Sequence, residues 1–290
     1  HCVQMCGPLV VAYSIPLAIA TALGTLALQI DKIIVSSMCR PEAFAVYSNG
    51  AIEIPLVGIL TGSIMAVILP DLRCLAAAHD NQGALALFRQ AAAKTAMVLM
   101  PTMMFLLVSA EPFILTLFSS KYAASVLPFR LYLLILPMRL VTFGAFLMAF
   151  GQTRTVLYRS AVGLAANLAL SILLVQRLGY IGAILGTLVS LYFVEGLWNF
   201  ISISRIAKCP WQAVLPFRAV GQLAGISILA CVPVALLAPF GIHMPAIIRL
   251  GVNGVVFVVA LLSLTWLFRI ETFKRELVSL WTAISSRRRA

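Results

Sequence analysis

Charged residues are scarce in this sequence of 290 residues. Asp, Glu, Lys and Arg together make up 10% of the chain, whereas apolar residues make up 62%. A typical soluble domain has about 25% charged and 45–50% apolar residues. The composition therefore predicts a polytopic membrane protein. Acidic residues are the rarer kind, with nine against 21 basic ones.

The sequence also lacks long polar segments, so no loop could hold a soluble catalytic domain. We find no nucleophile–base–acid set, no D-x-D pair for a sugar-nucleotide metal and no Gly-rich phosphate loop before a helix. We therefore expect a protein that is not an enzyme, with no cofactor and no metal. The basic residues sit in short loops between apolar spans, which does not indicate nucleic-acid binding. The cysteines show no zinc or redox spacing; they are Cys2, Cys6, Cys39, Cys74, Cys209 and Cys231.

Long apolar runs dominate what is present. About 20 apolar residues cross the ~30 Å hydrocarbon core of a bilayer as a helix. Eight such spans are predicted, at residues 8–30, 44–69, 95–118, 126–150, 157–176, 180–202, 218–239 and 246–268. The predicted fold class is all-α, a polytopic membrane bundle of about eight transmembrane helices. Residues 71–94 carry apolar side chains at helical spacing, which predicts an amphipathic cytoplasmic helix or, equally, a helix packed on the spans.

Basic residues orient the spans. If residue 8 enters from the cytoplasm, fourteen Lys and Arg residues lie on the cytoplasmic side and six on the other. By the positive-inside rule, both ends of the chain are then cytoplasmic. The chain starts at His1 without an initiator methionine or a signal peptide, and we expect it to be part of a longer protein.

The stretch from Ala43 to Leu72 is apolar but contains Asn49, Glu53 and Pro55. A carboxylate in mid-membrane costs about 2.5–3.5 kcal/mol, so Glu53 should face a cavity or the protein interior. Pro55 lacks a backbone donor, which predicts a bend just after Glu53. A transport path and a structural, paired glutamate explain these features equally well.

Arg139 lies near the middle of the predicted span 126–150, two residues after Pro137. A guanidinium there needs a carboxylate, water or an anionic ligand, and its fork suits phosphate. We predict an anion-binding role, with an ion pair to Glu53 or Glu195 as the alternative. Arg130 would lie on the opposite face of a straight helix, although a kink at Pro137 could change that.

Other polar residues are less decisive. Asp31 and Lys32 are adjacent near the outer end of the first span and cannot face each other. Each needs another partner, and interfacial water would serve. Glu195 lies between aromatic residues near the inner end of its span, which favours a structural role. Three G-x-x-x-G pairs, at 58/62, 182/186 and 221/225, predict close helix packing.

Several blocks of sequence resemble bacterial polysaccharide flippases, the lipid-linked oligosaccharide (O-antigen type) exporters of the multidrug/oligosaccharidyl-lipid/polysaccharide superfamily. The blocks are QIDKIIVSS at residues 29–37, the stretch 43–72, LFSSKYAASVLPFRLYLLILPMRLVTFGAFLMAFGQTR at 117–154 and NLALSILLVQRLGYIGAILGT at 167–187. The resemblance implies two six-helix bundles. Residues 1–205 would form the second bundle, and residues 206–290 two additional helices with a basic cytoplasmic tail.

The resemblance also implies a function. The substrate would be an undecaprenyl-diphosphate-linked oligosaccharide, flipped to the outer leaflet of the bacterial inner membrane by alternating access, for cell-surface polysaccharide such as lipopolysaccharide. Arg139, Arg130 and Asn49 would bind substrate. Glu53, Asp31 and Lys32 would be coupling or cavity residues. Implied partners are the first bundle and a polysaccharide polymerase or glycosyltransferases. The alternatives are a cation-coupled multidrug exporter and a non-transporting scaffold subunit of an assembly complex.

Overall fold

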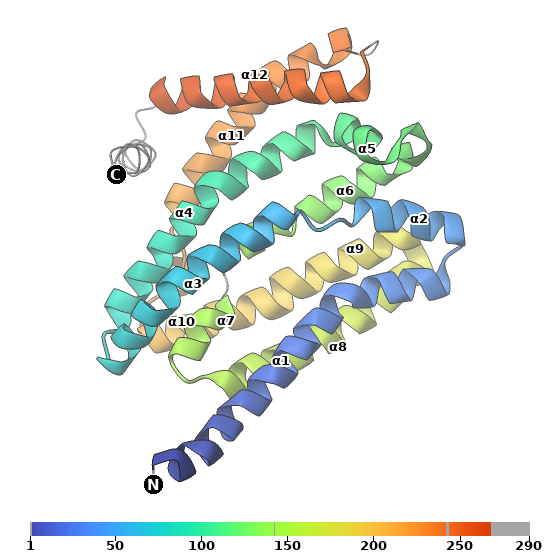
Figure 1. Cartoon of the computed structure of the whole chain (residues 1–290). Helices are drawn as coiled ribbons and strands as arrows, with labels where there is room; N and C mark the ends of the chain where they lie inside the picture. The colour runs from blue at the N-terminus through green and yellow to red at the C-terminus, as the bar shows by residue number, and fades with distance from the viewer. Residues whose placement is uncertain (1, 142, 242–243, 268–290) are drawn as a thin grey trace.

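The structure is a computed structural model that describes residues 2–141, 143–241 and 244–267. Over these residues the chain is helical and contains no strand, which confirms the all-α class (Figure 1). The main helices are α1 (Cys2–Met38), α2 (Pro41–Gly50), α3 (Pro55–Ala77), α4 (Asn81–Val108), α5 (Ala110–Phe118), α6 (Val126–Leu133), α7 (Phe143–Ala149), α8 (Thr153–Leu178), α9 (Tyr180–Val189), α10 (Leu197–Ala207), α11 (Phe217–Leu237) and α12 (Ala246–Leu267). Short helical turns are η1 (Ser120–Ser125), η2 (Leu136–Arg139), η3 (Ser190–Gly196), η4 (Trp211–Ala213) and η5 (Ala238–Gly241).

The described helices account for up to eight membrane crossings. Six are long and apolar enough to span on their own, and two more crossings are pairs of segments bent by 41° and 47°. The bent pairs are Ala18–Ala27 with Gln29–Met38, and Ser120–Leu133 with Leu136–Ala149. The α3–α4, α7–α8 and α10–α11 connections lie at one end of the bundle, and the α1–α2, α8–α9 and α11–α12 connections at the other (Figure 1). This alternation agrees with the eight predicted spans.

The second span differs from its prediction. Residues 44–69 do not form one helix, because α2 ends at Gly50 and α3 begins only at Pro55. Pro55 occupies the first turn of α3 and Ile54 before it is extended, as expected for a residue that precedes proline. The predicted bend after Glu53 is therefore a complete break, and the crossing runs over Pro55–Ala77.

The predicted amphipathic helix at residues 71–94 is not a separate element. Its first part is the end of α3 and its second part the start of α4, which Asp80 caps by accepting a 2.8 Å hydrogen bond from the Gly83 backbone. The apolar side chains that suggested an interfacial face are buried in the protein, and the Phe88 ring lies 5.2 Å from that of Phe146 on α7. They pack the core and not a membrane surface.

Helix α8 packs against both α1 and α9. A glycine pair allows the close approach of α9, because a Cβ at Gly182 would overlap the Leu174 carbonyl group and one at Gly186 would lie 2.7 Å from Ser171 Oγ. This G-x-x-x-G pair therefore has the predicted packing role. The other two pairs do not pack within the described chain, since a Cβ at Gly58, Gly62, Gly221 or Gly225 would meet nothing within 4 Å.

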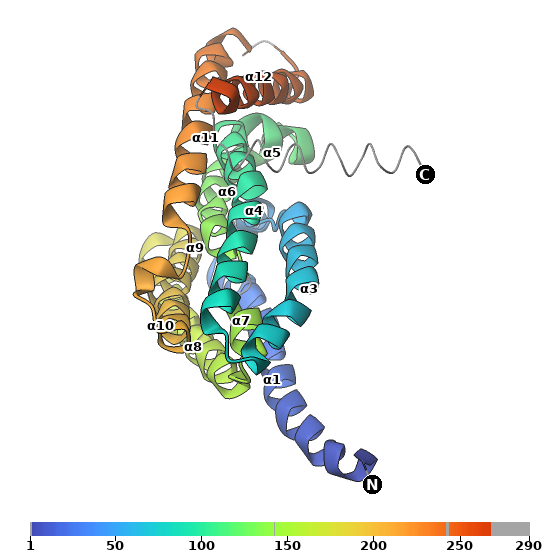
Figure 2. The same ribbon diagram turned by 90° about the vertical axis from the view of Figure 1, so that its left-hand side faces the viewer.

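Helices α11 and α12 extend the bundle on the side of α4 and α5 (Figure 2). Phe105 of α4 and Phe257 of α12 have ring centroids 5.4 Å apart. Arg249 of α12 forms a 2.9 Å ion pair with Glu111 of α5. This ion pair holds α12 to the end of the bundle, away from the polar interior between α1, α6 and α8.

The contrast between the glycine pairs is testable. Gly182→Ala should destabilise the protein by about 1–3 kcal/mol, because the added methyl group overlaps the α8 backbone. Gly58→Ala makes the same chemical change at a position with free space, and should leave stability unchanged or slightly raised. Thermal unfolding of both purified variants in detergent measures this. Equal unfolding midpoints would show that α8 and α9 do not approach as closely as described.

Candidate functional site

Three interruptions of regular helix lie close together inside the bundle. They are the break between α2 and α3, the short turn η2 after α6, and the π-helical turn η3 in the crossing Tyr180–Ala207. Turn η2 begins at Leu136 with Pro137 in its first turn, and it packs on η3, where Gly196 lies against Met138. Such breaks within a membrane span are tolerated where the backbone is buried in protein or lines a cavity.

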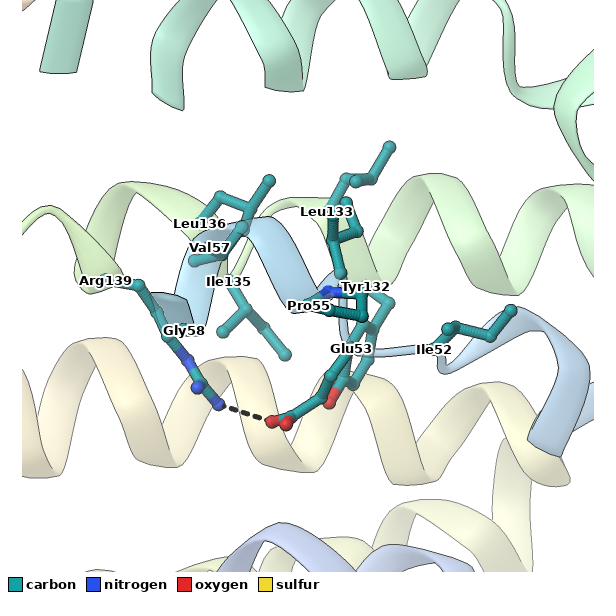
Figure 3. A pocket seen from close by; sticks show the side chains of 11 residues that line it. Ile52, Glu53, Pro55, Val57, Gly58, Tyr132, Leu133, Ile135, Leu136 and Arg139 are labelled. Atoms are coloured by element: carbon teal, nitrogen blue, oxygen red, sulfur yellow. Dashed lines mark hydrogen bonds and ion pairs between the residues drawn. The ribbon is translucent and has the colours of Figure 1, made fainter. Parts of the chain in front are cut away.

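Arg139 and Glu53 form an ion pair across two of these interruptions. Arg139 Nη2 lies 2.9 Å from Glu53 Oε1 (Figure 3). The ion pair that was the alternative to anion binding is therefore present, but it is not buried, since the side chains are 32% and 50% exposed. Both residues line a largely apolar cavity of about 320 Å³, with Pro55, Tyr132 and Leu136 among its walls.

A second, more polar cavity of about 470 Å³ lies next to the first. The two share Tyr132, Ile135 and Arg139, so the Arg139 side chain stands at their boundary. The polar residues that line this second cavity come from α1, α3, α6, η2, α8 and the crossing Tyr180–Ala207; they are Thr21, Thr25, Asp31, Thr61, Tyr132, Arg139, Arg159, Ser160, Asn167, Thr187, Ser190, Glu195 and Asn199. The second cavity therefore offers many hydrogen-bonding groups inside the spans.

Asp31 is buried in the wall of the second cavity, with only 4% of its surface exposed. One carboxylate oxygen, Oδ2, accepts hydrogen bonds from Tyr47 at 3.1 Å and from Thr187 at 3.0 Å. The other, Oδ1, has no partner among the described residues. The further partner that Asp31 was expected to need is thus supplied by hydroxyl groups of α2 and α9, where interfacial water had been considered sufficient.

Asn167 extends this hydrogen-bond network across α8. Its Oδ1 accepts from Ser171 at 2.8 Å and from Thr187 at 3.3 Å, while its Nδ2 donates to the Ala27 carbonyl oxygen at 3.4 Å. The network thus connects α1, α2, α8 and α9 through polar side chains alone. A connected set of this kind fixes the relative positions of helices that apolar packing alone would leave free to slide.

A second ion pair, Arg159 with Glu195, was missed as a site by the sequence reasoning. Arg159 was assigned to a cytoplasmic loop and Glu195 to a structural place near the interface. Instead both line the polar cavity, with Arg159 Nη1 3.7 Å from Glu195 Oε2. The sequence did hold a signal, because α8 buries small or polar residues at helical spacing: Ser160, Gly163, Asn167 and Ser171.

Only half of the predicted site residues meet. Arg139, Glu53 and Asp31 line the cavities, whereas Arg130, Asn49 and Lys32 line neither of the two. Arg130 is exposed because it lies on α6, before the bend that redirects the chain into η2. The two cavities together carry three carboxylates and two guanidinium groups, so carboxylates outnumber guanidinium groups in the described lining.

Comparisons with known proteins agree with this fold. The family model described as "Polysaccharide biosynthesis protein" matches residues 8–127. Among solved structures, "Lipid II flippase MurJ, inward closed conformation" superposes with a TM-score of 0.63 at 16% sequence identity, over 87% of this chain and 52% of that chain. The chain thus spans about half the length of that flippase. A search of curated protein sequences finds no match.

The chain is therefore a multi-pass membrane protein whose fold is similar to that of a solved lipid II flippase. Together with the family match, this similarity confirms the predicted resemblance to the polysaccharide flippases of the multidrug/oligosaccharidyl-lipid/polysaccharide superfamily. Superposition at 16% identity carries the fold alone, because most side chains at equivalent positions differ. The roles of individual residues must be argued from the cavities of this chain.

The hydrogen bond to Asp31 can be tested by a single hydroxyl deletion. Tyr47→Phe should destabilise the protein by about 1.5–3 kcal/mol, because it removes one of two donors to a buried carboxylate. Tyr158→Phe is the matched control, since Tyr158 is 62% exposed. Thermal unfolding in detergent measures both variants. An unchanged midpoint for Tyr47→Phe would contradict the described network around Asp31.

Proposed function

We propose that this protein flips a lipid-linked glycan across the bacterial cytoplasmic membrane. The substrate class is an undecaprenyl-diphosphate-linked oligosaccharide, moved from the cytoplasmic to the outer leaflet for cell-surface polysaccharide synthesis. The proposal includes both ends of the chain in the cytoplasm, which the fourteen-to-six distribution of basic residues between the two sides favours. The observation that carries the proposal is the Arg139–Glu53 pair, which stands between an apolar and a polar cavity inside the spans.

The arrangement of the cavities suits an amphiphile. An isoprenoid carrier needs apolar walls, and the cavity formed by α3, α6 and η2 supplies them. A diphosphate and its sugars need hydrogen-bonding groups, which line the adjacent cavity. Arg139 lies where these two environments meet, and its planar fork can bind two phosphate oxygens at once. The partial exposure of its side chain leaves it accessible to a ligand.

Alternating access would require no covalent chemistry on the substrate. The breaks at Pro55 and Pro137 give the crossings places at which to bend, and Glu53 lies in the first of them. We assign Arg139 to substrate binding, Glu53 to neutralising it in the empty cavity, and Asp31 to coupling between α1, α2 and α9. The chain spans 52% of the MurJ chain, and we propose that a second bundle completes the transport path. Contact with a polysaccharide polymerase or glycosyltransferases is part of the same proposal.

A cation-coupled exporter of the same superfamily is the second candidate. It is favoured by one observation, the excess of carboxylates over guanidinium groups in the cavity linings. Cationic dyes would then be pumped by reconstituted protein in a proton- or sodium-dependent way. Such pumping, together with no movement of a lipid-linked glycan, would replace the proposed function.

Arg139→Ala in the full-length protein should abolish flipping, lowering the initial rate at least about tenfold, because the diphosphate loses a charge-assisted partner. The assay follows a fluorescent undecaprenyl-diphosphate glycan across proteoliposome membranes, with protein level and insertion measured in parallel. Arg249→Ala is the matched control, since it also breaks a 2.9 Å arginine–glutamate pair but lies at neither of the two cavities. Normal flipping by Arg139→Ala would remove Arg139 from the substrate site.

A further inference from the structure

Arg159 is held unusually loosely for an arginine inside a membrane bundle. Its side chain is 18% exposed and lines the polar cavity. Its two hydrogen bonds, to Asn199 Oδ1 and to Ser160 Oγ, are both 3.4 Å long. Its Nε is buried without any partner among the described residues. A guanidinium has five donors, so Arg159 keeps unused hydrogen-bonding capacity in a site where that is costly.

Glu195 is the only carboxylate paired with Arg159 among the described residues, and the pairing is weak. The 3.7 Å between Arg159 Nη1 and Glu195 Oε2 exceeds the 2.7–2.9 Å of a strong charge-assisted hydrogen bond. Glu195 and Arg139 line the same polar cavity. The carboxylate thus shares this cavity with both arginines and makes a short contact with neither among the described residues.

The backbone around Glu195 is shaped to hold its carboxylate in this place. Glu195 belongs to the π-helical turn η3, a distortion that is frequent at functional sites. On the opposite helix, a Cβ at Gly163 would lie 2.8 Å from Glu195 Oε1, so a larger residue there would displace the carboxylate from this position. Two local features of separate helices therefore place one anionic group in front of Arg159.

We propose that Arg159 is a second anion-binding residue of the cavity and that Glu195 occupies the anion position until the substrate displaces it. This rests on the proposed function and specifies its diphosphate site: Arg139 and Arg159 bind the same anionic group from two sides. A diphosphate has more acceptor oxygens and more charge than one carboxylate, so it satisfies the Nε and Nη donors that Glu195 leaves free. The exchange keeps every guanidinium paired with an anion.

Displacement by exchange explains why the cavity linings carry no excess of positive charge. An empty cavity with two unpaired arginines would be costly within the membrane. With Glu53 opposite Arg139 and Glu195 opposite Arg159, both are neutralised while no substrate is bound. A ligand that brings its own negative charge takes the place of these carboxylates, whereas a neutral lipid does not.

The test is binding of geranylgeranyl diphosphate to the purified full-length protein in detergent, with neutral geranylgeraniol and inorganic pyrophosphate as comparison ligands. Glu195→Gln should bind the lipid diphosphate about three- to tenfold more tightly, because a neutral amide is displaced from Arg159 more easily. Arg159→Gln should bind it about tenfold more weakly or worse, and Arg159→Lys should lie between, since it keeps the charge and loses the fork. Geranylgeraniol binding should not change in any variant.

Arg249→Gln is the matched control, because Arg249 has the same 18% exposed side chain and a buried Nε without a partner; it should bind like the wild type. Pyrophosphate that competes with the lipid would show that the headgroup alone is recognised, in support of the proposal. A purely structural Arg159–Glu195 pair predicts instead that Glu195→Gln lowers the unfolding midpoint and does not tighten binding, which would overturn it. If Arg139→Gln alone weakens binding, this inference fails and the proposed function stands. Absence of diphosphate binding by the wild type would overturn both.

Discussion

The cost of charge in a hydrocarbon environment governs the interior of this protein. An ionised side chain in mid-membrane is expensive unless another charge, a polar group or water accompanies it. Each arginine that lines the cavities has a glutamate opposite it, and the buried Asp31 carboxylate has two hydroxyl donors. The apolar side chains of the bundle therefore pack around these paired groups. An apolar residue in place of either member of a pair would leave the other member unpaired.

Interrupted helices are what allow these groups to meet. In an unbroken helix, Glu53 and Arg139 would project at angles set by regular helical geometry. The extended segment before Pro55 and the turn at Pro137 release both residues from that geometry, and they meet at 2.9 Å. Glu195 reaches Arg159 from a π-helical turn instead. Proline and π-turns thus have the same consequence here: each places a charged group in the cavity and not toward lipid.

Sequence reasoning predicted the fold class and the number of spans, and it singled out Glu53 and Arg139, which line a cavity in the structure, because apolar length and intramembrane charge depend on local composition. It misplaced the second span and residues 71–94, since short apolar helices on either side of a turn have the same composition as one long helix. Arg130 and Lys32 were expected at the site and lie outside it, because helix orientation depends on packing. Arg159 was missed because a charge near a span end is usually taken as topological.

A cavity in which carboxylates match or exceed guanidinium groups selects its ligands differently from a cationic one. A cationic cavity attracts any anion, including the phosphate and small metabolites of the cytoplasm, in proportion to charge. A neutralised cavity admits an anion only if its contacts exceed those of the carboxylate that it displaces. In the proposed exchange, a diphosphate with an apolar tail would meet that condition, because the apolar cavity beside Arg139 would add contacts that a small anion cannot make. On that proposal, selectivity for a lipid-linked anion would follow from neutralisation and the adjacent apolar cavity acting together.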